Sequence, residues 1–469
     1  MTTALSLLLR RALTWFLAAT FVVQALPAPA HAFLFGGVTI RDEKEMGRKF
    51  DAMIRSNLSV IDDPEVRQYV MSLTERLVRT MPKQPYTFNA SVILNNALNA
   101  FAVPGGYIYV FSGLIMNFDS EDELVGVMAH ELAHVTQRHV ASRLERAQFV
   151  SLGSLLLAVA GIAAGGPGGG AVAVSALGAG QATMLNYSRL DETEADQIGL
   201  QYLVAAGYPP EGMVNGFKVL RRKSMMSGAS VPSYLSTHPA IGERINTLQS
   251  RIAAMPDKAR ESPSENRRFK RVNTLLWARY GDEQAALQRF SKNDALSCMG
   301  RGIVLNRLNR IPQASAAFDK ALAAAPDDAL VLREAGVFHF RRGEMRRAGD
   351  LLEAALRLDP KDYMAAFYYA RMLDETGRGG AAGYYEDVLR HVPEDAEVHE
   401  AYARSLGKSG RQFEAYVHLT YSVLYADRQK LAERYFAKAR SLAEHAPDKR
   451  PFQRLEAAYK ERREMWKKR

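Results

Sequence analysis

The chain has 469 residues, of which 47 % are hydrophobic and 24 % charged, close to the globular average, so a wholly disordered or fibrous chain is excluded. At roughly 150 residues per domain, this length predicts two to four structural units. The single cysteine, Cys298, excludes an internal disulfide framework and a cysteine-rich metal site. The formal charge of +10 favours an anionic partner, but does not choose between nucleic acid, membrane and acidic protein.

The N-terminal segment is typical of an export signal. Two arginines precede an apolar run, Leu13 to Leu26, which at about 14 residues is shorter than the ~20 of a transmembrane helix. Ala30 and Ala32 fit the small-x-small pattern of a signal-peptidase site. We therefore predict a signal peptide over residues 1–32 and a mature protein in the bacterial periplasm, with an uncleaved anchor as the alternative.

Residues 33–253 mix helical periods with short strand-like runs, and we expect them to form one domain. Within it, residues 150–184 form two apolar arms around a glycine-rich centre, too short to span a membrane. They suggest a mobile flap or a hairpin in peripheral contact with a membrane, although a packed helical hairpin fits the pattern equally well. Residues 254–266 are polar, contain two prolines and predict an interdomain linker.

Residues 267–469 are helical and repeat with a period of about 34 residues, the tetratricopeptide period. Small residues where two helices cross, a glycine between paired helices and a closing proline carry this pattern. Examples are Ala314, Ala348 and Ala382; Gly343, Gly377 and Gly410; and Pro326 and Pro360. We predict at least four units stacked into a superhelix with a concave groove, the alternative being an unrelated helical array. With no nucleic-acid module evident, we expect no nucleic-acid partner.

A metal-ligand motif lies in the first domain, at His130-Glu131-Leu132-Ala133-His134. Ser120 and Glu123 predict a capping box at the start of its helix. Because His130 and His134 are four residues apart on a helix, both imidazoles lie on one face and can share a metal ion. Glu131 is placed to take a proton from the attacking water.

A second acidic helix, opening at Asp191, can supply the third ligand that catalytic zinc needs. Glu192 and Glu194 are the two candidates, and they point about 160° apart on a helix, so both cannot serve. Asp196, one turn beyond Glu192, can hold a ligand imidazole by its other N–H. His139, five residues after His134, lies off the metal face and is interpreted as structural.

Three segments together resemble the zinc metallopeptidase family of HtpX and the CAAX prenyl proteases: Asn99 to Gly106, His130 to His134, and Ser188 to Asp196. The resemblance implies that Glu192 is the third zinc ligand beside His130 and His134. It further implies that Asp196 is not a ligand itself but supports one of the ligand side chains. It also implies a mainly α fold, in which a zincin-like α+β metallopeptidase domain with a small sheet precedes an α-solenoid of tetratricopeptide repeats.

The combination of export signal, peptidase domain and repeats is similar to that of periplasmic proteases that support outer-membrane β-barrel assembly. This resemblance implies a zinc-dependent endopeptidase that cleaves misfolded or misassembled envelope proteins. Its partners would be unfolded or misassembled outer-membrane proteins and the β-barrel assembly machinery, and the repeats would dock to the machinery or to substrates. The alternative is a periplasmic chaperone or scaffold that acts through its repeats and keeps a latent metal site.

Two further hypotheses concern residues that we expect near the predicted metal site. Thr237-His238-Pro239 matches a family motif, so we expect His238 to stabilise the oxyanion or to be a fourth ligand that silences the site; alternatively it fixes the turn before Pro239. Residues 107–111 read as a strand. An extended substrate would add beside it and contact Tyr107 and Tyr109, unless the strand is buried with no free edge.

Overall fold

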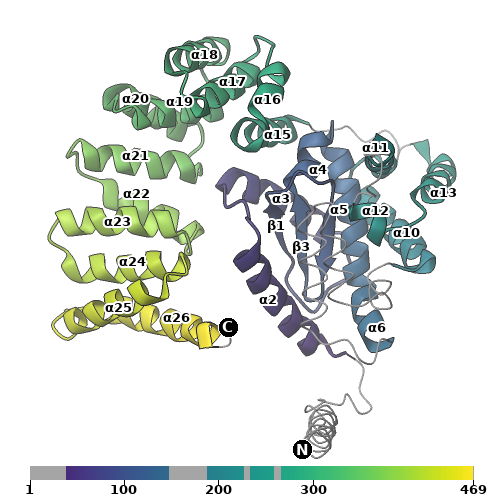
Figure 1. Ribbon diagram of the computed structural model, residues 1–469, viewed down its shortest axis with the longest axis horizontal. Helices are drawn as coiled ribbons and strands as arrows, with labels where there is room; N and C mark the ends of the chain where they lie inside the picture. Colours follow the sequence, from purple (N-terminus) through teal and green to yellow (C-terminus); the bar gives the residue numbers. More distant parts are fainter. Residues whose placement is uncertain (1–37, 147–186, 227–232, 258–265, 468–469) are drawn as a thin grey trace, which may run out of the picture.

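The computed structural model describes residues 38–146, 187–226, 233–257 and 266–467 (Figure 1). The predicted signal peptide over residues 1–32, the glycine-rich segment 150–184 and most of the predicted linker 254–266 lie outside these residues. Among the described residues, no helix combines the length and the apolar character that crossing a membrane requires.

The N-terminal half is built on a three-stranded sheet. Its strands are β1 (Asn89–Ile93), β2 (Ala100–Val103) and β3 (Tyr107–Phe111). β3 is central: it pairs in parallel with β1 on one side and antiparallel with β2 on the other. Side chains alternate along β3: Ile108 and Val110 join the main core, whereas Tyr107, Tyr109 and Phe111 pack in a second cluster with α2.

Helices cover both faces of this sheet (Figure 1). Local sequence fixes several of their starts: Thr39 and Ser188 each form a capping box, and the Asp63 side chain accepts two backbone N–H groups. The helices of this half are α2 (Ile40–Asn57), α3 (Pro64–Val78), α4 (Ser112–Asn117), α5 (Glu121–Thr136), α6 (His139–Arg146), α10 (Arg189–Ala205), α11 (Glu211–Met226), α12 (Ser233–Thr237) and α13 (Ile241–Ala253).

The C-terminal half is an array of antiparallel helix pairs. Its helices are α15 (Arg267–Tyr280), α16 (Glu283–Arg289), α17 (Ala295–Arg307), α18 (Ile311–Ala324), α19 (Ala329–Arg341), α20 (Met345–Leu358), α21 (Tyr363–Glu375), α22 (Ala381–His391), α23 (Ala396–Lys408), α24 (Gln412–Tyr425), α25 (Gln429–Ala443) and α26 (Arg450–Lys467). Gly343, Gly377 and Gly410 occupy the turns inside successive pairs with positive φ, and Asn309 takes this role in the pair before them. The predicted fold class is confirmed.

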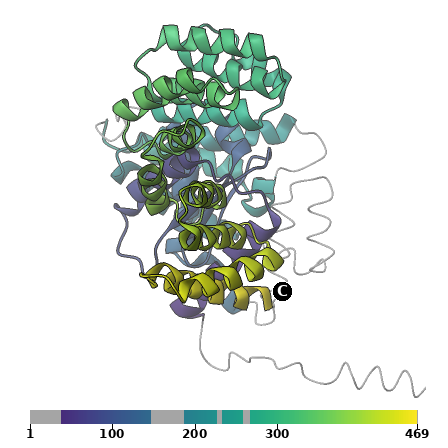
Figure 2. The same cartoon turned by 90° about the vertical axis from the view of Figure 1, so that its left-hand side faces the viewer.

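Helix α15 joins the two halves. Phe269, Val272 and Leu276 pack into the core of the N-terminal half, whereas Leu275 packs into the core of the repeats. The Trp277 indole also donates a hydrogen bond to the carbonyl of Met116, at 2.8 Å. From α15 the array curves back and runs down beside the N-terminal half (Figures 1 and 2). The repeats are therefore held against the first domain rather than trailing from it.

A buried cluster of charges, here called the junction cluster, fixes this arrangement. Arg333 on α19 bonds Glu65 of α3 at 2.7 Å, and also Glu334 at 2.9 Å and Asp362 at 3.0 Å. Arg279 of α15 pairs with Glu334 at 2.7 Å and with Asp63. Because these groups come from both halves, separating the halves would leave several buried charges without partners.

Candidate metal centre

Helix α5, buried on nearly every side, is the scaffold of the site and packs against both α10 and α11. The approach to α10 is close because Gly199 lies against the backbone of His130: a Cβ on this glycine would meet the His130 Cα at 3.0 Å. Glu192, Asp196 and Gly199 are spaced by four and three residues, so they share the face of α10 that meets α5. This crossing carries both acids to the histidines.

The capping of α5 differs in one detail from the prediction. The Ser120 hydroxyl accepts the backbone N–H of Glu123, as expected of the N-cap residue. The Glu123 carboxylate, however, accepts the N–H of Asp119 at 2.8 Å instead of that of Ser120. The short bond of the reciprocal half therefore comes from the residue before the N-cap, and the helix begins where the sequence indicates.

Four side chains converge on one point: His130, His134, Glu192 and His238. One ligand atom from each lies within 4.8 Å of all the others, and all four side chains are buried. The Nε2 atoms of His130 and His134 are 3.0 Å apart, and Nε2 of His134 is 3.4 Å from a Glu192 oxygen. Nδ1 of His238 lies 2.9 Å from the same oxygen. The structure thus brings together the three predicted ligands and His238.

Each motif histidine is oriented through its other ring nitrogen. Nδ1 of His130 lies 3.0 Å from Asp196, which therefore sits where the sequence predicts a holder of a ligand imidazole. Nδ1 of His134 lies 2.9 Å from Nδ1 of His139, whose Nε2 faces Glu194 at 3.3 Å. If Glu194 accepts from His139, then His139 accepts from His134, and Nε2 of His134 keeps its lone pair for the centre.

Electrostatics keep these groups in the states that a metal requires. Burial, with the nearby Arg244, lowers the pKa of His130 to about 4, and burial lowers that of His134 well below its usual range. Burial opposes ionisation of Glu192, but the charges of His238 and Arg244 outweigh it and hold its pKa well below the usual value. At neutral pH His130 and His134 are therefore neutral and Glu192 is ionised, the forms that bind metal ions.

Glu131 lies beside the cluster, completely buried, and its two carboxylate oxygens have no hydrogen-bond partner within the described part of the chain. Burial raises its pKa to about 7. Nε2 of His238 is the ring atom that faces it, 3.6 Å from Oε1. The His238 ring is stacked between Tyr187 and Tyr234, with ring centroids at 4.9 and 4.4 Å. His238 thus points into the centre.

Sequence reasoning missed Arg244. This residue of α13 is buried and makes two hydrogen bonds to Asp196, at 2.7 and 2.8 Å, while its NH1 contacts Glu192. Its guanidinium also lies over the Phe217 ring, 4.6 Å from the centroid. A signal was present: an arginine on the buried face of an amphipathic helix, six residues after His238, needs an acidic partner.

The predicted addition of an extended substrate beside the strand that carries Tyr107 and Tyr109 is wrong. β3 uses both of its hydrogen-bonding edges for β1 and β2, so no extended chain can add beside it. Alternation along β3 also turns both side chains toward α2, away from the face of the sheet that α5 covers. Tyr109 is buried there, and its hydroxyl donates to Asp51 at 2.8 Å.

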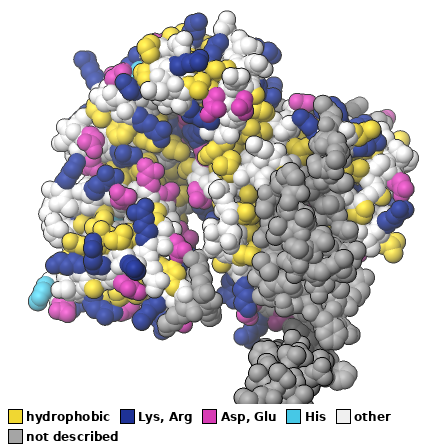
Figure 3. Space-filling view, in the orientation of Figure 1, with side chains coloured by type: hydrophobic (Ala, Val, Ile, Leu, Met, Phe, Trp, Pro, Cys, Tyr) yellow, Lys and Arg dark blue, Asp and Glu magenta, His cyan; other side chains and the backbone are white. Residues whose placement is uncertain are grey.

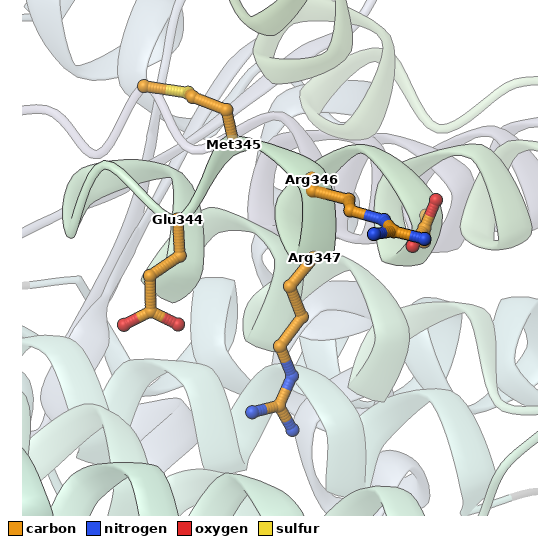
Figure 4. A pocket seen from close by; sticks show the side chains of 5 residues that line it. Glu344, Met345, Arg346 and Arg347 are labelled. Carbon is orange, nitrogen blue, oxygen red and sulfur yellow. The ribbon is translucent and has the colours of Figure 1, made fainter.

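The repeats offer a different kind of surface. A shallow depression at the start of α20 is lined by Glu344, Met345, Arg346, Arg347 and Asp350 (Figure 4). Both acidic and basic side chains line it, and across the face of the repeats drawn in Figure 3 the two signs are also interspersed. This depression contains no histidine and lies apart from the converging donors, so it is not part of the metal centre.

The donor set fits a divalent metal ion. Three imidazoles and a carboxylate offer nitrogen and oxygen donors from separate elements, and the facing Nε2 atoms of His130 and His134 are at a separation that a shared cation would stabilise. Two buried carboxylates without full pairing, those of Glu131 and Glu192, add the negative charge that such an ion would offset.

Comparison with known proteins identifies the domain. Residues 62–252 match the model of peptidase family M48, and residues 299–363 and 346–396 match a tetratricopeptide repeat model. The chain carries an M48 peptidase domain followed by tetratricopeptide repeats. The M48 match encloses the whole converging cluster, and it confirms the metallopeptidase family and the repeats that the sequence predicts.

The chain is also similar to named proteins of two bacteria. A Vibrio cholerae protein provisionally named beta-barrel assembly-enhancing protease is 36 % identical over 269 residues, covering 55 % of this chain and 53 % of its own. The beta-barrel assembly-enhancing protease of Escherichia coli strain K12 is 31 % identical over 310 residues, covering 63 % of this chain and 62 % of its own. The aligned region thus spans less than two thirds of either relative.

Among solved structures, one of MamA is 22 % identical and covers 33 % of this chain and 95 % of its own, with a TM-score of 0.29. A match at that score carries no argument about this protein.

Proposed function

We propose that this protein is a zinc-dependent endopeptidase. The observation that carries the proposal is the convergence of His130, His134 and Glu192, from two helices, beside a buried glutamate in an M48 domain. Catalytic zinc takes three such ligands and keeps a further position open. A bound zinc ion supplies a Lewis acid that polarises a carbonyl and makes water a better nucleophile at neutral pH.

The roles of the side chains follow from their positions. His130, His134 and Glu192 hold the ion, and Asp196 fixes the ring of His130. Glu131 takes a proton from the water that attacks the peptide carbonyl and returns it to the leaving amine. A pKa of about 7 suits both steps, because the group can then accept and donate a proton near neutral pH.

His238 has two roles compatible with its position. Its Nδ1 lies among the ligand atoms, which supports a fourth ligand that would silence the site until displaced. Its Nε2 faces Glu131, which supports a donor to the oxyanion formed during attack. Replacing His238 by alanine separates the two: loss of a fourth ligand lowers metal affinity and opens the site, whereas loss of an oxyanion donor lowers hydrolysis with metal retained.

We further propose a periplasmic protein that cleaves misfolded or misassembled envelope proteins. The names of the relatives in Vibrio cholerae and Escherichia coli support a role in β-barrel assembly. The repeats support docking to assembly machinery or to substrates, because stacked helix pairs form extended binding surfaces. Their fixed position against the peptidase domain, through α15 and the junction cluster, would keep a docked protein beside this domain.

Casein hydrolysis by the purified full chain tests the proposal. We expect one zinc per chain, hydrolysis that a chelator abolishes and zinc restores, and a rate about 10² to 10⁴-fold lower in Glu131→Gln with its zinc retained. The control variant Glu414→Gln, on the repeats, should hydrolyse casein at the wild-type rate. Chelator-resistant hydrolysis, or full activity in Glu131→Gln, would contradict the proposal, and a zinc-loaded wild type that does not hydrolyse casein would favour a scaffold acting through its repeats.

A further inference from the structure

Two carboxylates at the metal centre share one guanidinium. Glu192 is 1 % exposed and Asp196 is 5 % exposed, and Arg244, itself 5 % exposed, contacts both. Buried carboxylates without a cationic partner are strongly destabilising. Since the three groups come from α10 and α13, their mutual attraction also ties these helices together beneath the two histidines of α5.

The geometry calls for a guanidinium in particular. Nε and NH2 of Arg244 donate to the two oxygens of Asp196, at 2.8 and 2.7 Å, in the parallel fork that only arginine provides. NH1 is then left to contact Glu192. The Phe217 ring, over which the guanidinium lies, also meets the His130 ring edge-on at 5.5 Å. Arg244 and Phe217 therefore pack together as one unit. This unit sets the positions of the predicted ligand Glu192 and of Asp196, which holds the His130 ring.

We propose that Arg244 is a positioning residue that acts as a built-in counter-cation, holding Glu192 and Asp196 in place for the metal before it binds. The inference rests on the proposed metal site. The charges support it: Glu131, Glu192 and Asp196 carry three negative charges when ionised, and Arg244 with a divalent ion carries three positive charges. Without the ion, Arg244 is the arginine that neutralises part of this charge; with it, the ion shares the task.

Thermal unfolding of the full chain, in chelator and in excess zinc, tests the proposal with a readout other than activity. For Arg244→Met we expect the melting temperature to fall by about 5–10 °C in chelator and by less than half as much in zinc. The zinc-induced shift is therefore larger than in the wild type. Arg244→Lys keeps the charge but cannot donate to both oxygens of Asp196 at once. Its melting temperature in chelator should therefore lie between those of the wild type and Arg244→Met.

A charge-balanced control separates this role from packing. Arg244→Met combined with Asp196→Asn removes one carboxylate together with the cation, so its melting temperature in chelator should recover by at least half. If Arg244→Met alone does not fold without zinc, a folded double variant supports the proposal and an unfolded one overturns it. Equal losses with and without zinc, or no recovery in the double variant, would also overturn it.

The test distinguishes this inference from the proposed function. A zinc-induced shift in the wild type that Arg244→Met leaves unchanged contradicts the role of Arg244 alone. No zinc-induced shift in the wild type, together with no bound zinc, contradicts the metal site and the inference with it.

Discussion

The protein contains two buried clusters of charge, and they differ in what they can do. In the junction cluster, arginines meet carboxylates: Arg333 is paired with Glu65, Glu334 and Asp362 at 2.7 to 3.0 Å. In the metal centre, one arginine contacts two carboxylates, and three imidazoles converge with one of these carboxylates. The junction cluster joins two halves of the chain, whereas the metal centre turns ring nitrogens toward a common point.

The difference shows that buried charge alone does not make a site. Arginine has only donors and stays protonated, so in the junction cluster each carboxylate faces a guanidinium that cannot itself bind a metal ion. Neutral histidines whose Nδ1 atoms are already engaged present lone pairs on Nε2, and the nearby Glu131 oxygens have no partner among the described residues. Donor atoms that converge without satisfying one another are the signature of the metal centre.

The largest expected effect is on zinc affinity, which should depend on the metal centre and not on the junction cluster. Glu192→Ala removes a ligand, so zinc affinity should fall by more than ~100-fold and casein hydrolysis should drop to background. Glu65→Ala, the matched change in the junction cluster, should leave the zinc content of the folded protein unchanged. Zinc analysis of both variants after dialysis checks this, and a Glu192→Ala protein that keeps its zinc would remove Glu192 from the ligand set.

The second prediction concerns the free energy of unfolding, to which the junction cluster should contribute more than an exposed ion pair does. Arg333→Met leaves three acids of the junction cluster short of a partner, so the free energy of unfolding should fall by about 3–5 kcal/mol. The control Arg390→Met breaks a pair with Asp387 whose arginine side chain is 65 % exposed, and should cost less than ~1 kcal/mol. Urea unfolding at pH 7 measures both; similar losses for the two variants would show that the junction cluster does not hold the halves together.

The smallest expected effect concerns the turns of the repeats. Gly343 has a φ of +77° with open space around its Cα, so Gly343→Ala should cost about 1 kcal/mol from backbone strain alone. Gly407 lies within α23 with the same open space and no positive φ, and Gly407→Ala should stabilise by about 0.5 kcal/mol. Urea unfolding should therefore give opposite signs, and equal signs would mean that the turn geometry is not what Gly343 supplies.

The sequence predicts best what depends on neighbours along the chain. The motif helix, the acidic helix opening at Asp191 and the repeat period are all set within a few turns, by capping residues and apolar spacing. The convergence of His130, His134 and Glu192 followed from two helix faces and a family motif. His238 could be placed near the site by its motif, although its role could not.

What depends on contacts between distant segments escaped prediction. The position of β3 in the middle of the sheet, which excludes the addition of a substrate strand along Tyr107 and Tyr109, follows from a β1–β3 pairing that no local pattern encodes. Arg244 lies 48 residues beyond Asp196, and only the packing of α13 brings them together. The sharing of α15 between two cores likewise depends on which of its faces each half buries.

One measurement tests the central claim most directly: anomalous X-ray diffraction above and below the zinc absorption edge, from crystals of the full chain grown with zinc. The account predicts one strong zinc peak at about 2.0–2.3 Å from Nε2 of His130, Nε2 of His134 and a carboxylate oxygen of Glu192. No peak between these side chains, or a zinc ion held elsewhere while Glu192 binds only Arg244, would contradict it.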